Sequence, residues 1–219
     1  MSKQLQINIE NNQFILDYRK VIFWQDKKIL LLTDTHFGKS DSLRSQGISI
    51  PSGATNHDLE ILSSIIKDYS IHSIYFLGDL IHNKSSDTEN LIEQFRKFRD
   101  EHLGFKFNLI IGNHDEKANK LLDKLGLDEI KRDIIIDEFL LTHEPPESPE
   151  LFTFCGHIHP GISINDGFGK IKLPCFHLGK KFCVLPAFGT LTGKVNIKTK
   201  KDERAICIAD GEMLEIKTK

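Results

Sequence analysis

The stretch ILLLTDTH, residues 29–36, decides the fold that we predict for this chain. Its four consecutive apolar residues are typical of a short strand that is buried on both faces of a sheet. The run ends abruptly in Asp34 and His36, and open α/β sheets bind their ligands just beyond such strand ends. A carboxylate oxygen beside an imidazole nitrogen suits Mn, Fe or Zn better than Ca. Alone, the pair is a weak signal for a metal site, because a capping Asp and an ordinary loop His are the more common explanation.

The order of strand, polar tip and helix recurs twice more in the first half of the chain. The apolar run 74–77 ends in Gly78-Asp79, and the run 107–111 ends in GNHD, residues 112–115. Periodic apolar residues predict helices at about 55–69, 87–102 and up to residue 125. This alternation predicts a parallel α/β sheet with right-handed crossovers.

The rest of the chain predicts further strands. Residues 4–32 hold short apolar–polar alternations that lead into the central strand. Short strands are expected in the second half at residues 134–136, 139–141 and 152–155. The β-branched segments that follow residue 161 suggest a second, largely antiparallel sheet. We therefore expect one domain, residues 1–219, of two packed sheets with helices outside.

The overall charge is close to balanced. A formal net charge of −2 argues against a broad electrostatic footprint on nucleic acid, but it leaves room for a local basic groove. The tract from Lys194 to Arg204 is rich in lysine between β-branched residues. It fits a solvated strand face, and it also fits a surface that contacts nucleic acid.

The sequence carries no signal for export or for a membrane. No apolar run approaches the ~20 residues that a membrane span needs, and residues 1–6 lack the apolar core of a signal peptide. The four cysteines show no C-x-x-C spacing, so we expect them to be reduced and buried. We expect a cytoplasmic protein that does not bind membranes.

Each buried strand of the predicted core is followed by side chains that can bind a metal. They are Asp34, His36, Asp79, Asn113, His114, His143, His157 and His159. One of them alone could cap a helix or be a hydrogen-bonded histidine. Burying all of them without a cation would be costly. Glycines at 78, 112 and 156 permit tight turns and close backbone approach beside them.

These blocks, in this order and spacing over residues 30–160, resemble the five-block signature of the calcineurin-like metallophosphoesterases. The resemblance implies the metallo-dependent phosphatase fold, a four-layer αββα sandwich of two mixed β-sheets flanked by helices. It also implies two metal ions at the strand ends. Position by position, the first ion would be bound by Asp34, His36 and His159, the second by Asn113, His143 and His157, with Asp79 bridging them.

Other motifs are similar to the DNA-ligase-associated branch of that family. They are Phe37-Gly38-Lys39, Leu43-Arg44-x-x-Gly47, Pro51-x-Gly53 and the stretch LPAFG at 185–189. Leu43 departs from this pattern, because an aromatic residue is expected beside the arginine. The resemblance implies a role in DNA repair, with manganese as the most favoured ion, Fe or Zn as alternatives, and association with a DNA ligase or helicase. We also expect a homo-oligomer.

The resemblance also assigns roles around the metal ions. His114 would assist the leaving group or stabilise the transition state, and an imidazole is a side chain suited to proton donation. Asp115 would either orient His114 or cap the third helix. The Ser- and Gly-rich residues 40–53 are expected to form a long loop, a candidate substrate lid. In it Arg44 would contact a phosphate or be solvated, and His82 is a candidate for substrate contact or for supporting a ligand.

The predicted activity is therefore that of a dinuclear metal-dependent phosphoesterase. Two ions about 3.5–4 Å apart activate water, hold a phosphate oxygen and neutralise developing charge. The favoured reaction is phosphodiester hydrolysis in a nucleotide or nucleic acid. The alternative is a phosphomonoesterase or nucleotide pyrophosphatase that acts on a small molecule. A binding scaffold without activity would have lost ligands, and here every position is filled.

Overall fold

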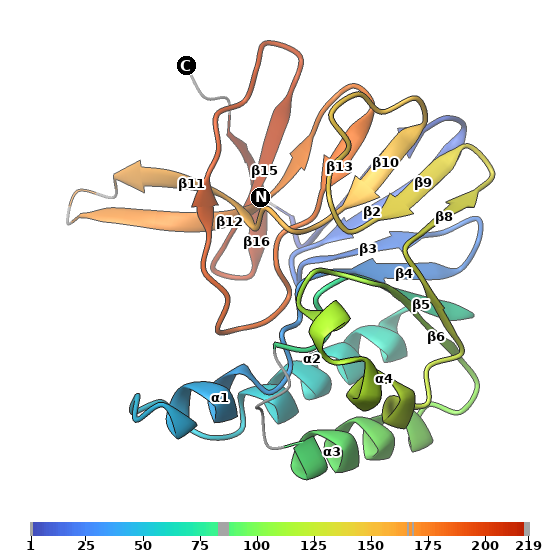
Figure 1. The fold of residues 1–219 in the computed structure, drawn as a ribbon. Helices are drawn as coiled ribbons and strands as arrows, with labels where there is room; N and C mark the ends of the chain where they lie inside the picture. The colour runs from blue at the N-terminus through green and yellow to red at the C-terminus, as the bar shows by residue number, and fades with distance from the viewer. Residues whose placement is uncertain (1, 83–87, 166, 168, 217–219) are drawn as a thin grey trace.

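The computed structural model describes residues 2–82, 88–165, 167 and 169–216, and it forms two packed β-sheets with helices on one side (Figure 1). The first sheet has the order β1 (Gln4–Ile9), β2 (Asn12–Asp17), β3 (Val21–Trp24), β4 (Ile29–Leu32), β5 (Ser73–Leu77), β6 (Lys106–Ile110) and β7 (Glu129–Lys131). Strands β1 to β4 pair antiparallel and β4 to β7 pair parallel. The predicted parallel sheet therefore continues into an antiparallel half.

The second sheet comes from the second half of the chain, as expected. Its order is β14 (Val195–Asn196), β11 (Pro160–Asn165), β12 (Lys170–Leu178), β13 (Phe182–Val184), β10 (Phe152–Cys155), β9 (Phe139–Thr142) and β8 (Asp133–Ile136), with β15 (Arg204–Ala209) and β16 (Glu212–Ile216) paired beside β12. Most pairs are antiparallel, but β9, β10 and β13 run parallel to one another. The predicted pair of mixed sheets is confirmed.

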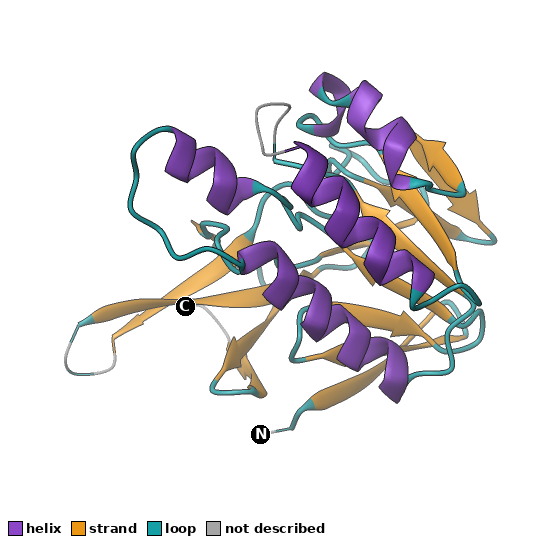
Figure 2. Cartoon of the chain, turned by 90° about the horizontal axis from the view of Figure 1, so that it is seen from below, coloured by secondary structure: helices purple, strands orange, loops and turns teal. Residues whose placement is uncertain are grey.

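The helices cover the outer face of the first sheet (Figures 1 and 2). They are α1 (Lys39–Ser45), α2 (Ala54–Asp68), α3 (Thr88–Asp100), the 3₁₀ turn η1 (Asp115–Lys117) and α4 (Asn119–Leu125). All helices of the described residues lie between β4 and β7 in sequence, so the helical layer covers one sheet only. Residue 87, where we expected the second helix to begin, lies outside the described residues.

The central strand β4 is buried on both faces, as its composition predicts. Leu30 and Leu32 pack against the helices, whereas Ile29 and Leu31 face the second sheet. The core between the sheets is rich in aromatic rings, and the centroids of Trp24 and Phe139 lie 4.8 Å apart in an edge-on arrangement. This double packing fixes the end of β4 relative to both sheets.

The segment predicted as a long loop, residues 40–53, is partly helical. Helix α1 covers residues 40–45 of this segment, and the residues after Ser45 lack regular structure. The three serines of α1 lower its intrinsic helix propensity, but burial of Ser40 and Ser42 favours the helix. An ion pair between Asp41 and Arg44, one turn apart, favours it as well. The prediction of a loop is therefore wrong for residues 40–45, and the role of this segment as a substrate lid stays a prediction.

The buried carboxylate of Asp17 ties β2 to helix α2. It pairs with the Arg19 guanidinium at 2.8 Å and accepts a hydrogen bond from the Tyr69 hydroxyl at 2.7 Å. Burial alone would raise the pKa of Asp17, but the hydrogen bonds from Arg19 and Tyr69 lower it below its ordinary value of 3.8. Because the folded-state pKa is the lower one, this stabilisation is present above pH 3.8 and is lost as the pH falls through the folded-state pKa.

We expect Asp17→Asn to lower the free energy of unfolding at pH 7 by about 3 kcal/mol, because the largely buried Arg19 guanidinium loses the buried one of its two charged partners. Urea unfolding at pH 7 and in acid checks this, and the difference between the proteins should shrink in acid. The matched control is Asp68→Asn, which removes the exposed partner of the same Arg19 and should cost under about 1 kcal/mol. Equal losses in the two variants would contradict the argument.

Candidate metal centre

The predicted ligands lie beyond strand ends of both sheets. Asp34, Asp79 and Asn113 follow the parallel strands β4, β5 and β6, while His143 and His157 follow the parallel strands β9 and β10. Because parallel strands end at one edge, each sheet gathers its own side chains there, and the packing of the two sheets brings the edges together. The site is therefore built from residues far apart in sequence.

The backbone at these positions is unusual. Five of the predicted ligands have a positive φ, namely Asp34 (52°), His36 (46°), Asp79 (52°), His157 (67°) and His159 (52°). Non-glycine residues rarely adopt this left-handed conformation, and such residues cluster at functional sites. The unusual backbone positions therefore coincide with the predicted ligands.

One group of potential ligands consists of Asp34, His36 and His159. One ligand atom from each lies within 4.8 Å of the others. His159 Nε2 lies 3.1 Å from Asp34 Oδ1, and Asp34 and His36 are almost fully buried. These are the three residues that the sequence resemblance assigns to the first ion.

A second group surrounds the Nε2 atom of His143. This atom lies 3.5 Å from Asp79 Oδ1, 3.3 Å from Asn113 Oδ1 and 3.2 Å from His157 Nδ1. The opposite ring nitrogen, Nδ1, donates to the carbonyl oxygen of Leu77 at 2.8 Å. In the neutral ring this contact leaves Nε2 unprotonated, which is the form that binds a metal.

Two buried atoms of the first group indicate that a cation fits the site. Asp34 Oδ1 and His36 Nδ1 have no hydrogen-bond partner among the described residues. The other oxygen of Asp34, Oδ2, accepts from the Thr33 hydroxyl at 2.9 Å and from the His157 backbone N–H at 3.0 Å. Asp34 Oδ2 is thus held by hydrogen bonds, while buried Oδ1 accepts none from the described residues and lies 3.1 Å from His159 Nε2, itself a potential ligand. A buried anionic oxygen in this situation is costly unless a cation binds it.

The charges of the site are strongly coupled. Burial would raise the pKa of Asp79, but the hydrogen bond and positive charge of His143 lower it to about 2. Burial would in turn lower the pKa of His143, and Asp79 raises it to about 9. A cation that binds His143 Nε2 must therefore displace a proton from the ring. Burial lowers the pKa of His36 to about 3 despite the opposing charges of Asp79 and Asp34, so that His36 is neutral.

His114 lies at the open side of this cluster. Its backbone N–H donates to Asp79 Oδ1 at 2.9 Å, and its side chain is 37% exposed. Ring atom Nδ1 donates to the carbonyl oxygen of His82 at 2.6 Å, and Nε2 lies 3.9 Å from Asp79 Oδ2. The backbone contact orients the ring, so Nε2 is the atom that can exchange a proton with a bound molecule.

Asp115 contacts backbone rather than the His114 ring. Its buried carboxylate accepts the N–H groups of Leu80, Ile81 and Gly112 at 3.0–3.3 Å. Burial raises the pKa of Asp115 to about 6, although these donors oppose the rise. These contacts tie the segments after β5 and β6 together, so Asp115 positions the site instead of orienting His114 directly.

The two predicted substrate contacts differ in their positions. The His82 ring lies beside those of His36 and His114, with centroids 5.7 and 5.5 Å away. Burial, helped by the charge of Lys39, lowers the pKa of His82 to about 4. Arg44 instead pairs with Asp41 of its own helix at 2.6 Å, and its side chain is 41% exposed. The structure brings His82 into the cluster and shows no such contact for Arg44 among the described residues.

Sequence reasoning missed the supports around Asp34. The Thr33 hydroxyl reaches both Asp34 Oδ2 and the Leu77 carbonyl, and it fills the space that a side chain on Gly156 would need. From the far end of the chain, the N–H of Gly189 donates to the Asp34 carbonyl oxygen at 3.2 Å. A threonine next to an aspartate in sequence does not by itself indicate a hydrogen bond between them. A single sequence also does not show that the loop containing Gly189 packs against Asp34.

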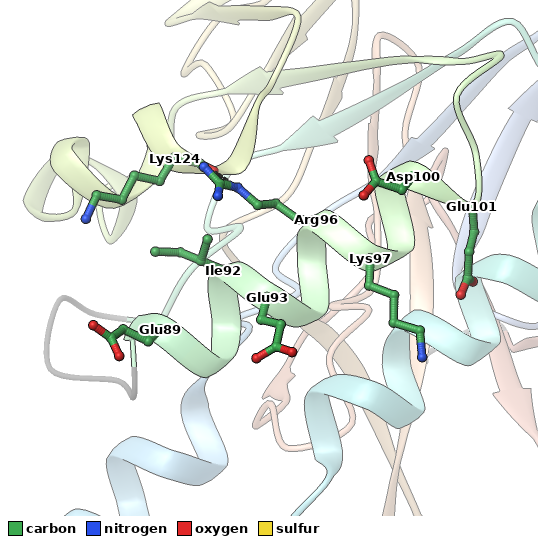
Figure 3. Close-up of a pocket in the computed structure, with 8 residues that line it drawn as sticks. All are labelled: Glu89, Ile92, Glu93, Arg96, Lys97, Asp100, Glu101 and Lys124. Atoms are coloured by element: carbon green, nitrogen blue, oxygen red, sulfur yellow. Dashed lines mark hydrogen bonds between the residues drawn. The ribbon is translucent and has the colours of Figure 1, made fainter.

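A surface hollow between α3 and α4 is separate from this centre (Figure 3). Four carboxylates and three cations line it together with Ile92. The charged side chains do not converge on one point in Figure 3. Arg96 uses its Nε to donate to the Lys124 carbonyl. This hollow has the properties of a solvated helix surface.

Comparison with known proteins points to one family. The calcineurin-like phosphoesterase profile matches residues 27–184. Among solved structures, the nuclease MPE of Pseudomonas putida is similar with 25% identity and a TM-score of 0.85, over 97% of this chain and 100% of that one. The protein of unknown function AQ665 from Aquifex aeolicus is 21% identical over 64% of this chain and 81% of its own, with a TM-score of 0.42. No curated protein matches the chain. In the described residues, no helix is both long and apolar enough to span a membrane.

Proposed function

The chain belongs to the calcineurin-like phosphoesterases, and on that premise we propose that it is a dinuclear metal-dependent phosphodiesterase that cleaves nucleic acid. The family makes it a phosphoester hydrolase that uses divalent metal. The number of ions, their identity as manganese and the nucleic-acid substrate are the proposed parts. A role in DNA repair beside a ligase or helicase stays a prediction from the sequence resemblance.

The position of the Asp79 carboxylate carries the dinuclear proposal. Its Oδ2 lies 3.8 Å from His36 Nε2, and its Oδ1 lies 3.5 Å from His143 Nε2. The two oxygens thus face the two ligand groups, one on each side. Asp34, His36 and His159 would hold one ion and Asn113, His143 and His157 the other, with Asp79 between them.

Bound divalent ions would supply Lewis acidity, a lowered pKa for water and neutralisation of charge on the phosphate. The chain's own residues position that chemistry. Asp115 fixes the segments that carry Asp79 and Asn113, and the His82 carbonyl orients His114. His114 Nε2 then faces the site and, when protonated, can donate to the oxygen of the leaving group. The His82 ring lies beside it and is proposed to contact the substrate.

The nuclease of P. putida favours a nucleic-acid substrate, because the likeness extends over nearly the full length of both chains. The ligand set alone fits monoesters as well. A phosphomonoesterase or nucleotide pyrophosphatase that acts on a small molecule is therefore the second candidate, and Fe or Zn is the alternative to manganese.

The experiment that tests the proposal uses two chromogenic esters and a DNA oligonucleotide as substrates. The protein is stripped with a chelator, reloaded separately with Mn, Zn or Mg, and its bound metal is counted by elemental analysis. We expect two ions per chain and Mn-dependent hydrolysis of bis-p-nitrophenyl phosphate that exceeds hydrolysis of p-nitrophenyl phosphate. A preference for the monoester would favour the second candidate. Two bound ions with no activity on either ester or on DNA would reject the proposed function.

A further inference from the structure

Positive charge in this chain is concentrated in residues 160–201. This segment contains one acidic residue, Asp166, and eight lysines, at positions 170, 172, 180, 181, 194, 198, 200 and 201. The remainder of the chain has 21 basic and 30 acidic residues, a net charge of −9. The near-neutral total therefore hides a strong asymmetry, and such a local patch can bind a polyanion.

Strands β11 and β12 form an arm that projects from the body of the molecule (Figures 1 and 2), and β14 pairs with the first two residues of β11. Side chains alternate between the two faces of its strands. One face is apolar, and Ile162, Ile164 and Leu173 pack there in a small core shared with β15 and β16.

The other face of the arm is polar and basic. The strand register places Lys172 opposite Ser163 and Lys170 opposite Asn165, and all four are exposed. Lys194 lies beside them, because a Cβ on Gly161 would meet Lys194 Cβ at 3.1 Å and Lys172 Cγ at 3.2 Å. Lys172 also donates through Nζ to the Lys194 carbonyl oxygen at 2.9 Å. We call the face formed by Lys170, Lys172 and Lys194 the basic face.

The basic face begins at the metal centre. His159, a predicted ligand, immediately precedes β11, and its carbonyl oxygen accepts the N–H of Val195 at 2.9 Å. His159 and Lys194 line one shallow pocket, which Lys20 also lines. Lys20 Nζ donates to the Phe188 carbonyl oxygen at 3.0 Å, which places a further cation between the arm and the segment that supports Asp34. A chain of cations thus extends outward from one ligand.

We propose that the basic face binds the phosphate backbone of a nucleic-acid strand whose scissile phosphodiester lies at the metal centre. The inference rests on the proposed function and adds the surface that would select a polynucleotide over a small ester. Lysine ammonium groups contact phosphates as point charges, so this surface holds the strand without reading its sequence. A single phosphodiester bound at the metal centre is too short to use it.

The test compares three variants of the Mn-loaded protein. The first carries Lys170→Gln, Lys172→Gln and Lys194→Gln, and the second carries arginine at the same positions. The matched control carries Lys67→Gln, Lys97→Gln and Lys124→Gln, which remove three exposed lysines from the helices. Each protein is assayed on bis-p-nitrophenyl phosphate and on a 30-nucleotide single strand at 50 and 200 mM NaCl, and thermal unfolding checks the fold.

We expect the first variant to keep its activity on the small diester within about twofold and to lose more than tenfold in kcat/KM on the 30-mer at low salt. The slope of log(kcat/KM) on the 30-mer against log[salt] should become less steep by about 2. Each of the three lost phosphate contacts accounts for ~0.7 of this change. The arginine variant and the control should behave like the unaltered protein. An equal change on both substrates, or an equal loss in the control, would overturn the proposal.

Binding separates this proposal from the proposed function. Fluorescence anisotropy of the labelled 30-mer is measured in a His114→Ala background, which is expected to slow cleavage. If no protein hydrolyses either substrate, the proposed function fails, and weaker binding by the first variant alone still supports the basic face. If all variants bind the 30-mer equally, or none binds it, the arm is a solvated surface and the proposal is wrong.

Discussion

Replacing Asp79 by Asn should remove bound metal and nearly all phosphodiester hydrolysis while leaving the fold intact. The substitution keeps an oxygen that can accept the His114 backbone N–H, a bond now 2.9 Å long to Oδ1. It removes the negative charge and one of the two carboxylate oxygens that face the two ligand groups. We expect metal affinity to fall by more than about 100-fold, since loss of a mere supporting partner of a ligand already costs 10–100-fold.

Elemental analysis after dialysis and hydrolysis of bis-p-nitrophenyl phosphate measure the two effects of Asp79→Asn. Asp123→Asn, an exposed carboxylate on α4, is the matched control for charge and should change neither. Urea unfolding of the metal-free proteins shows whether the fold survives. A variant that keeps two tightly bound ions would contradict the bridging role of Asp79.

His114→Ala should keep both ions and lose most turnover. The ring contributes no atom to the two ligand groups assigned to the ions, and its Nε2 faces the open side of the site. Loss of a positioned proton donor typically costs about 10²–10⁴-fold in rate. The loss should appear in kcat rather than in KM, because the interaction is needed mainly in the transition state.

The leaving group provides the sharper test of His114. p-Nitrophenolate departs without much help from a proton, whereas a nucleotide alkoxide needs one. The loss should therefore be larger on an oligonucleotide than on bis-p-nitrophenyl phosphate. His57→Ala, which removes an exposed histidine on α2, serves as the control. Full activity of His114→Ala on the oligonucleotide would show that the assigned role is wrong.

Much of the fold could be predicted because buried parallel strands are read directly from the sequence. Residues 29–32 form a continuous apolar run since both faces of β4 are covered, and the runs of β5 and β6 have the same cause. The polar residues after these strands gave the candidate ligands. The structure brings those ligands together, and their assignment to particular ions stays a prediction.

Other features depend on tertiary contacts that a single sequence does not display. Helix α1 forms from serine-rich residues because its buried side is covered, and Arg44 pairs with Asp41 rather than with the cluster around the ligands. Asp115 follows His114 in sequence, yet its carboxylate is satisfied by backbone N–H groups of a neighbouring segment. At Arg44 and Asp115, the position in sequence therefore did not predict which groups the side chain contacts.

The division of the ligands between two sheets also bears on how the molecule is held together. All four cysteines are free, so no disulfide joins the sheets among the described residues. An ion bound by Asp34 and His159 would close a loop of more than a hundred residues, as a removable crosslink. A covalent link over a ~100-residue loop stabilises by about 4.7 kcal/mol in the chain-entropy picture. The ion would instead stabilise the folded protein by mass action. The free metal concentration relative to its Kd would therefore set how much the ion stabilises the packing of the two sheets.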